Sequence, residues 1–476
     1  MEKFRTGYTY ADVLLVPKKT PLSSRGEADV KTRFTRNIAL NIPMVSSNMA
    51  TVTEHEMAIA MAREGGLGVI HQFGTIEEQV EEVRKVKKST SYVIENPVTC
   101  APEMLMNEAF DYMGREGVTS LIVVKDNKVE GILTSRDYIF EEDTNRKVED
   151  LMTKKEQLIS AKPGIKLEEA KKILKKNRIE KLPLIVEGDL RGLITSKDIT
   201  KLESWPLSSR DTKGRLMVAW ALGVKDCAER AKALIHVGVD VLVLDIAHAH
   251  SDLVIRKLRE LKTQFNNIDI MVGNIATADA ARDLILAGAD GLKVGIGPSP
   301  VCTTRIVSGA GVPQLTAIMD VCKIASQYNI PVSADGGIKF PGDLSKAVAA
   351  GASTGYCGSI FAGTDETPGI IVYREGRRYK RYMGSASYDN SHERKEHLEG
   401  KKHKKKLDVF VEGVTNLVEY KGSIAEIITS MIKGLRSGIS YCGAHNIKEM
   451  QINAEFIKMT SAGWEESKSR GFKLNE

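Results

Sequence analysis

The sequence predicts an α/β protein in which a parallel barrel of eight strand–helix units is interrupted by one inserted module. Short apolar runs alternate with helical stretches before residue 91 and again after residue 205, an order typical of a parallel sheet. A tandem repeat with an offset of about 61 residues separates these two parts. Two strands before the repeat and six after it make eight, so we predict a (β/α)8 TIM barrel with an insertion.

The first two barrel units are predicted before the insertion. Ile42–Val45 is a short apolar strand, and the polar loop Ser46–Met49 follows it. Glu54–Glu64 has apolar residues at helical spacing, and Gly65–His71 begins with a glycine stop and continues as a second buried strand.

The repeat in the middle of the chain predicts a separate module. Its first copy ends in Gly131-Ile-Leu-Thr-Ser-Arg-Asp137 and its second in Gly192-Leu-Ile-Thr-Ser-Lys-Asp198. Each copy carries a helical stretch and a pair of strands, a pattern that resembles a CBS pair, also called a Bateman module. The Thr, Ser and Asp side chains at each strand end suit a ribose and a phosphate, so an adenine or guanine nucleotide is an expected ligand. A purely structural insertion is the alternative.

We place the domain boundaries where the pattern changes. Residues 1–91 and 205–476 are predicted to form the barrel domain, and residues 92–204 the tandem CBS domains. The strands predicted after the insertion are Met217–Leu222, Val239–Asp245, Asp269–Val272, Gly291–Val294, Pro331–Ala334 and Thr354–Cys357. In such a barrel the loops that follow the strands carry the chemistry, so we expect these loops to meet at one end. They are Ser47–Met49, Asp245–Ser251, Asn274, the loop at Cys302, Asp335–Gly337 and Gly358–Ser359.

The stretch Gly291–Arg305 offers a candidate nucleophile. It begins as an apolar strand, breaks into a loop rich in glycine and proline, and presents Cys302 two residues before the hydroxyl of Thr304. Gly295 and Gly297 allow the backbone to turn and to approach a ligand closely. A thiol on such a loop is a plausible nucleophile, whereas most free cysteines are small buried hydrophobes.

Two glycine loops follow the last two predicted strands. Ser333–Ile338 contains Asp-Gly-Gly, and Tyr356–Ile360 contains Cys-Gly-Ser. Barrels often hold a phosphate at this place on backbone N–H groups, and Asp335 could accept hydrogen bonds from a ribose diol.

Composition limits the partners. The net charge is +6 over 476 residues, with basic and acidic residues mostly mixed, so nucleic-acid binding is not implied. No apolar run approaches the roughly 20 residues that cross a bilayer, and the N-terminus shows no signal-peptide core. The six cysteines show no CxxC pairing, which argues against a zinc site and a disulfide framework. We therefore expect a cytoplasmic protein with no membrane partner.

Several motifs together resemble the IMP dehydrogenase/GMP reductase family. They are TYADVLLVP, the inserted CBS pair, KVGIGPSPVCTTRIVSGAGVPQLTAI, SADGGIKFPGDLSKAVAAGA, CGSIFAGTDETPG, VEYKG and KGLRSGISYCGA. The resemblance covers nearly the whole chain. It implies an NAD(P)-dependent oxidoreductase whose cysteine thiolate attacks purine C2 of a nucleoside monophosphate, and it implies a homotetramer, or an octamer when the CBS pair binds nucleotide.

The resemblance also implies roles for individual residues. Cys302 is the nucleophile, Thr304 is its proton-relay partner, and Glu412 completes the relay from a mobile flap at about 384–420. The expected substrate contacts are Ser47, Met49, Asp335, Gly337, Gly358, Ser359, Tyr382 and Gly384. The expected cofactor contacts are Asp245, Asn274, Gly295 and Gly297. The carbonyls of Gly295, Gly297 and Cys302 resemble the monovalent-cation loop of the dehydrogenases, which implies K⁺.

Departures from the family motifs favour one of its two reactions. In the dehydrogenases an Arg-Tyr pair in the flap activates the hydrolytic water, and residues 384–411 contain no such pair. The motifs Asn48-Met49 and Gly384-Ser-Ala-Ser387 are more similar to the corresponding motifs of the reductases than to those of the dehydrogenases. In a further departure, Pro300 stands in place of a phosphate-binding serine. We therefore favour a GMP reductase that uses NADPH. An IMP dehydrogenase that uses NAD with an atypical flap is the alternative, and an inactive nucleotide-binding regulator is a second one.

The basic run at residues 400–406 allows two interpretations. A solvated loop is the simpler of these. Attraction of the cofactor's phosphates is the functional one, and a 2′-phosphate would favour NADPH.

Overall fold

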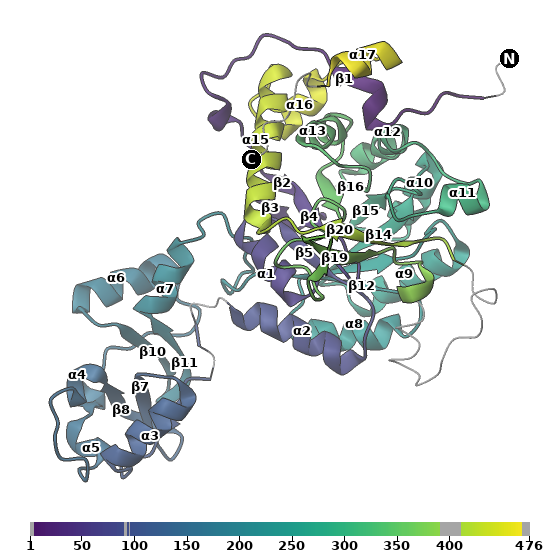
Figure 1. Ribbon diagram of the computed structural model, residues 1–476. Coiled ribbons are helices and arrows are strands. Elements are labelled where there is room, and N and C mark those ends of the chain that lie inside the picture. The colour runs from purple at the N-terminus through teal and green to yellow at the C-terminus, as the bar shows by residue number, and fades with distance from the viewer. Residues whose placement is uncertain (1–3, 90–92, 95, 391–410, 469–476) are drawn as a thin grey trace. The chain divides into compact units, whose positions relative to one another are not determined.

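A closed barrel of eight parallel strands forms the centre of the larger part of the protein (Figure 1). The computed structural model describes residues 4–89, 93, 94, 96–390 and 411–468. In order around the barrel the strands are β4 (Met44–Ser46), β5 (Leu67–Ile70), β12 (Ala219–Leu222), β13 (Val241–Asp245), β14 (Asp269–Ile275), β15 (Gly291–Val294), β16 (Val332–Asp335) and β17 (Thr354–Cys357). β17 pairs with β4 and closes the ring, which confirms the predicted fold class.

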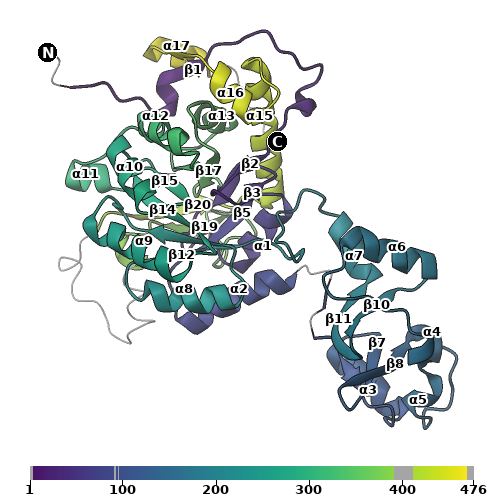
Figure 2. The same ribbon diagram turned by 180° about the vertical axis from the view of Figure 1, so that it is seen from behind.

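Helices follow the strands and surround the barrel (Figures 1 and 2). They are α1 (His55–Arg63), α2 (Ile76–Ser89), α8 (Cys227–His236), α9 (Asp252–Gln264), α10 (Ala278–Leu286), α12 (Gln314–Ala325), α13 (Pro341–Ala349) and α15 (Ile424–Tyr441). A short helix, α11 (Thr304–Ser308), comes between β15 and α12. No helix within the described residues is long and apolar enough to cross a membrane.

The strands separate two hydrophobic regions because their side chains alternate. Trp220 and Leu222 of β12 point outward and belong to the large core between strands and helices. Ala219 and Ala221 point inward and pack in the barrel interior with Phe34. Phe34 comes from the hairpin of β2 (Thr32–Arg33) and β3 (Ala39–Leu40), which the sequence analysis did not predict.

A second sheet lies outside the barrel and was also not predicted. It consists of β18 (Val372–Arg374), β19 (Arg377–Met383) and β20 (Thr415–Glu419), with β19 in the middle. The chain ends bring together β1 (Val13–Leu15) and β21 (Phe456–Lys458) as an antiparallel pair, and α16 (Ile447–Asn453) and α17 (Ser461–Glu466) flank β21 in sequence.

The chain divides into two compact units. One contains residues 1–89, 207–211 and 216–476, and the other contains residues 90–206 and 212–215. The second unit has the order β6 (Thr99–Cys100), α3 (Met106–Glu116), β7 (Ser120–Lys125), β8 (Lys128–Thr134), α4 (Ser135–Tyr138), α5 (Val148–Leu151), β9 (Thr153–Lys154), α6 (Leu167–Asn177), β10 (Lys181–Val186), β11 (Asp189–Thr195) and α7 (Ser196–Glu203). The hairpins β7–β8 and β10–β11 are the strand pairs of the two copies of the repeat, and α3 and α6 are their helices (Figure 2).

Each repeat ends in the same hydrogen bond. Thr134 Oγ1 donates to Asp137 Oδ2 at 2.8 Å, and Thr195 Oγ1 donates to Asp198 Oδ2 at 2.6 Å. These pairs lie where a hairpin passes into a helix, so in both copies the aspartate holds the first turn of the helix.

Candidate active site

A cavity of about 290 Å³ opens at the carboxyl ends of the barrel strands. Every residue predicted for catalysis, substrate or cofactor binding contributes to its lining: Ser47, Met49, Asp245, Asn274, Gly295, Gly297, Cys302, Thr304, Asp335, Gly337, Gly358, Ser359, Tyr382, Gly384 and Glu412. The barrel brings most of these residues together because parallel strands all present their carboxyl ends at one face, whereas Tyr382, Gly384 and Glu412 come from the segments around β19 and β20. The role of each residue stays a prediction.

Cys302, Thr304 and Glu412 form a continuous chain of hydrogen bonds. Cys302 Sγ lies 3.2 Å from Thr304 Oγ1, and Thr304 Oγ1 donates to Glu412 Oε2 at 2.6 Å. Cys302 is partly exposed, whereas the other five cysteines are buried. The chain offers a path for a proton between the thiol and the carboxylate.

The backbone holds this chain in place without help from the Glu412 side chain. Thr303 N–H donates to Glu412 O at 2.9 Å, and Glu412 N–H donates to Ala386 O at 3.1 Å. Val414 N–H donates to Val301 O at 3.0 Å. The segments at 384–387 and 411–414 are therefore fixed to the loop that carries the thiol. The rest of the predicted flap, 391–410, lies outside the described residues, as does the basic run at 400–406.

Glycine is required where the loop after β15 passes close to other backbone. A Cβ on Gly295 would lie 2.1 Å from Asp335 O, and Gly295 has a φ of +152°. The carbonyl of Gly295 accepts a hydrogen bond from Asn274 Nδ2 at 2.7 Å. Of the three carbonyls predicted to bind K⁺, this one can therefore offer only its remaining lone pair.

The loop after β17, which was predicted to contact a phosphate, begins with a tight turn. Residues 358–362 form a helical turn in which Ala362 N–H donates to Gly358 O at 2.9 Å. On its other side, Lys421 Nζ donates to the carbonyls of Ser359 at 2.8 Å and Ile360 at 3.1 Å. The ammonium orients these peptide units and adds positive charge beside the turn, and both effects favour an anion.

Tyr382 closes this part of the cavity. Burial raises the pKa of its hydroxyl, which keeps the group protonated. A hydroxyl in that state can donate a hydrogen bond to a ligand.

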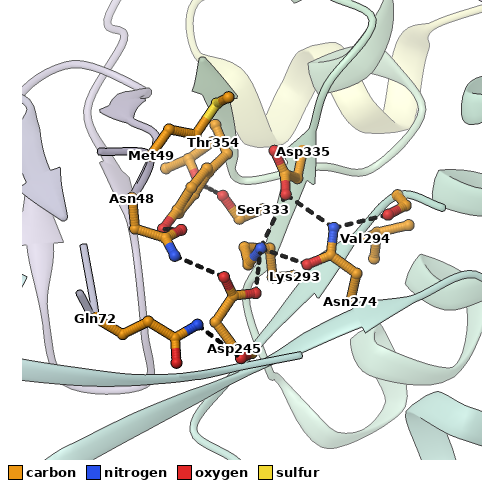
Figure 3. A network of polar contacts seen from close by, with 12 residues as sticks. Asn48, Met49, Gln72, Asp245, Asn274, Lys293, Val294, Ser333, Asp335 and Thr354 are labelled. Carbon is orange, nitrogen blue, oxygen red and sulfur yellow. Dashed lines mark hydrogen bonds and ion pairs between the residues drawn. The ribbon is translucent and has the colours of Figure 1, made fainter. Parts of the chain in front are cut away.

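A buried lysine, which the sequence analysis did not single out, links two carboxylates that line the cavity (Figure 3). Lys293 Nζ lies 2.8 Å from Asp245 Oδ1 and 2.9 Å from Asp335 Oδ2, and it also donates to Asn274 Oδ1. Its side chain is 3% exposed. Burial disfavours the charged ammonium, but Asp245 and Asp335 outweigh this effect and raise the pKa of Lys293. The lysine is therefore held as a cation.

Asn48 and Gln72 extend this network, and neither was predicted as a site residue. Asn48 Nδ2 donates to Asp245 Oδ2 at 2.6 Å, and Asn48 Oδ1 accepts from Tyr356 Oη at 2.7 Å. Gln72 Nε2 donates to the backbone carbonyl of Asp245 at 3.5 Å. The signal that could have found Lys293 is a lysine inside an apolar barrel strand, since a buried lysine almost always has a charged partner.

The fold and the lining of this cavity define a barrel protein with a partly exposed thiol in its cavity, and comparison with known proteins gives its family. The family described as "IMP dehydrogenase / GMP reductase domain" matches residues 7–470. The chain therefore belongs to this family of NAD(P)-dependent oxidoreductases, which act on purine nucleotides.

Similar proteins bear both names. The chain is 49% identical over 470 residues to an inosine-5'-monophosphate dehydrogenase of Nitrosopumilus maritimus, with 98% of each chain covered. It is 45% identical over 475 residues to a GMP reductase of Leishmania donovani, with 97% of this chain and 96% of that protein covered. A crystal structure of a cysteine-to-alanine variant of GMP reductase from Trypanosoma brucei, in complex with guanosine 5'-monophosphate, superposes with a TM-score of 0.88 at 42% identity and 99% coverage of both chains.

Proposed function

We propose that the protein is a GMP reductase, which uses NADPH to convert GMP to IMP and ammonia through a covalent bond between Cys302 Sγ and purine C2. One combined observation carries the proposal. The chain from Cys302 through Thr304 to Glu412 is complete, while residues 384–411 contain no Arg-Tyr pair to activate water. Such a site can form the covalent bond and protonate a leaving amine, but it lacks the pair with which the dehydrogenases activate water. It therefore fits reduction of the covalent intermediate better than hydrolysis.

The hydrogen-bond chain accounts for the proton transfers. As Sγ bonds to C2, the thiol proton passes through Thr304 Oγ1 to Glu412. Glu412 returns the proton through the same hydroxyl to the amino group, the bond between C2 and nitrogen breaks, and the ammonia that leaves takes up a proton from solvent. NADPH, when bound, would supply the hydride that C2 receives. Cleavage of the carbon–sulfur bond would then release IMP, and Cys302 would leave as the thiolate and take up the second proton from solvent. Overall, GMP, NADPH and two protons give IMP, NADP⁺ and ammonium.

The residues on the other wall fit a nicotinamide cofactor. Phe73 offers an aromatic face, Gln72 and Asn274 offer side-chain amides, and Asp245 offers a carboxylate for hydroxyl groups, all lining the same cavity as Cys302. This set would orient the cofactor toward C2. The choice of NADPH over NAD follows from the proposed reaction.

An IMP dehydrogenase that converts IMP and NAD to XMP is the second candidate. The similarity to the Nitrosopumilus dehydrogenase favours it. In that case a group other than an Arg-Tyr pair would have to activate water in the flap.

The remaining sequence predictions are kept as proposals. They are barrel and CBS domains bounded at 1–91, 92–204 and 205–476, an adenine or guanine nucleotide on the CBS pair, K⁺ on the loop after β15, and a homotetramer or octamer.

The absorbance of the reduced nicotinamide, followed with purified protein, tests the reaction. With GMP and NADPH the absorbance should fall, and with IMP and NAD it should stay flat; the Cys302→Ser variant is the control for each mixture. A rise with IMP and NAD would establish the dehydrogenase instead. No turnover in either mixture, with nucleotide still bound in calorimetry, would establish the inactive regulator.

A further inference from the structure

Two carboxylates of the cavity share a single cation. Asp245 ends β13 and Asp335 ends β16, and Lys293 on β15 bonds to both. The two carboxylates therefore lie within about 6 Å of each other, the range in which like charges strongly disfavour each other. Their side chains are only 16% and 19% exposed, so water screens this repulsion poorly.

Besides Lys293, each carboxylate has its own hydrogen-bond partner. Asp335 Oδ2 accepts from Lys293 and from Asn274 Nδ2 at 2.8 Å, while no hydrogen bond of the described residues reaches Asp335 Oδ1. Asp245 instead has Oδ1 on Lys293 and Oδ2 on Asn48. Figure 3 shows the ammonium between the two carboxylates, with Asn274 beside it.

We propose that Lys293 is a positioning residue that balances the charges of Asp245 and Asp335 and holds the two side chains in place, so that nucleotide and cofactor each find an acceptor in position. The proposal rests on the proposed function for its assignment of Asp335 to the nucleotide ribose and Asp245 to the cofactor. It holds for either reaction of the family, because both reactions need both ligands in one cavity.

The physical reason is charge balance. With Lys293 present, the group of three side chains carries one net negative charge. Without the ammonium the carboxylates would carry two in the same volume, and they would either move apart or take up one proton between them. A proton taken up at low pH would restore the single negative charge, whereas at higher pH the two unbalanced charges would push both side chains out of position for their ligands.

Other ionisable groups near the network do not replace the lysine. Burial raises the pKa of each of the hydroxyl and thiol groups around it, namely Tyr10, Tyr356, Tyr382 and Cys357. They are therefore neutral at working pH, and the Tyr356 ring adds a face 5.0 Å from the ammonium. Glu412 lines the same cavity and is bonded to Thr304.

Lys87 provides a matched control. It lies on α2, its side chain is 4% exposed, and its ammonium bonds to Asp240 at 2.7 Å and Asp211 at 3.1 Å. It has the same burial and the same number of carboxylate partners as Lys293, but it does not line the cavity. Any effect of Lys293→Met that only reflects a broken buried ion pair should also appear in Lys87→Met.

The experiment measures the binding of GMP, IMP and each cofactor separately by calorimetry across pH, in wild type, Lys293→Met, Lys293→Arg and Lys87→Met. We expect Lys293→Met to bind both ligand types about tenfold more weakly or worse, the effect of losing an interaction with a charged group. Its affinity relative to wild type should improve as pH is lowered, because a shared proton then restores the net charge. Lys293→Arg should recover part of the affinity, and Lys87→Met should bind as wild type does at every pH.

A double variant keeps the proposal testable if Lys293→Met folds poorly. Lys293→Met with Asp245→Asn removes the repulsion, so nucleotide affinity should return toward wild type while cofactor affinity stays low. Two results would overturn the proposal: equal losses in Lys293→Met and Lys87→Met, or a pH-independent ratio to wild type. Since binding and not turnover is measured, the outcome does not depend on which reaction the enzyme catalyses.

Discussion

Replacing Glu412 by glutamine should separate chemistry from binding. The side chain keeps its size and can still accept a hydrogen bond from Thr304, but it can no longer take up or deliver a proton. The backbone bonds from Thr303 N–H to Glu412 O and from Glu412 N–H to Ala386 O, at 2.9 and 3.1 Å, do not involve the carboxylate. The position of the segment should therefore survive the substitution.

These contacts set the size of the expected effect. Loss of a general acid or base costs between about 100-fold and 10,000-fold in rate, so we expect kcat to fall within that range. Nucleotide affinity should change by no more than about twofold, as for a substitution that disturbs no packing. The rate is followed by the absorbance of the reduced nicotinamide and by ammonia release, and the affinity by calorimetry.

Two further variants sharpen the test. Glu419→Gln changes a carboxylate on β20 that pairs with Arg377 and does not line the cavity, so it should leave kcat unchanged. Thr304→Val should match the loss in Glu412→Gln, because it interrupts the same chain, whereas Thr304→Ser should retain most activity. A wild-type kcat in Glu412→Gln, or an equal loss of rate and affinity, would refute the relay.

Three other predictions follow from the same site. Alkylation with iodoacetamide near neutral pH should give one adduct, on Cys302, and bound nucleotide should protect this thiol. The other five thiols are buried, and burial raises the pKa of Cys322 to about 12. Adducts on Cys322 or on the other buried thiols would contradict the prediction. Lys421→Met should weaken GMP binding about tenfold but leave guanosine binding unchanged, since the lysine bonds to the Ser359 carbonyl and Ser359 is proposed to contact the phosphate. Equal losses for both ligands in calorimetry would contradict it. Deletion of 92–204 should leave a soluble, active barrel in the absorbance assay, and an insoluble product would show that the inserted module is structural.

The barrel could be predicted because its strands have a simple local pattern. Gly291–Val294 and Thr354–Cys357 were predicted with the bounds that the structure has, since each is a short apolar run preceded and followed by a break in the pattern. Counting such runs gave the number of strands. The loops after them then followed from barrel geometry without any knowledge of side-chain contacts.

The sheet formed by β18, β19 and β20 could not be predicted from the local sequence pattern. Arg377–Met383 is rich in charged residues, and it forms a strand because it pairs with Thr415–Glu419, far along the chain. The contact between Thr304 and Glu412 has the same origin, as 108 residues separate them. The family motif brought Glu412 into the predicted site; its local sequence would not have done so.

Under the proposed mechanism, the anchored ends of the predicted flap would let one site serve both reactions of the family. Residues 384–387 and 411–414 form hydrogen bonds to each other and to the Cys302 loop, so the relative positions of Cys302 and Glu412 depend on these two ends. The Arg-Tyr pair of the dehydrogenases is missing from the sequence between them. A change in that sequence alters water activation, which only the dehydrogenase needs, and leaves addition of the thiol to C2, which both reactions need. We therefore expect the choice of reaction to follow the flap sequence, while Cys302→Ser should abolish whichever reaction the protein catalyses.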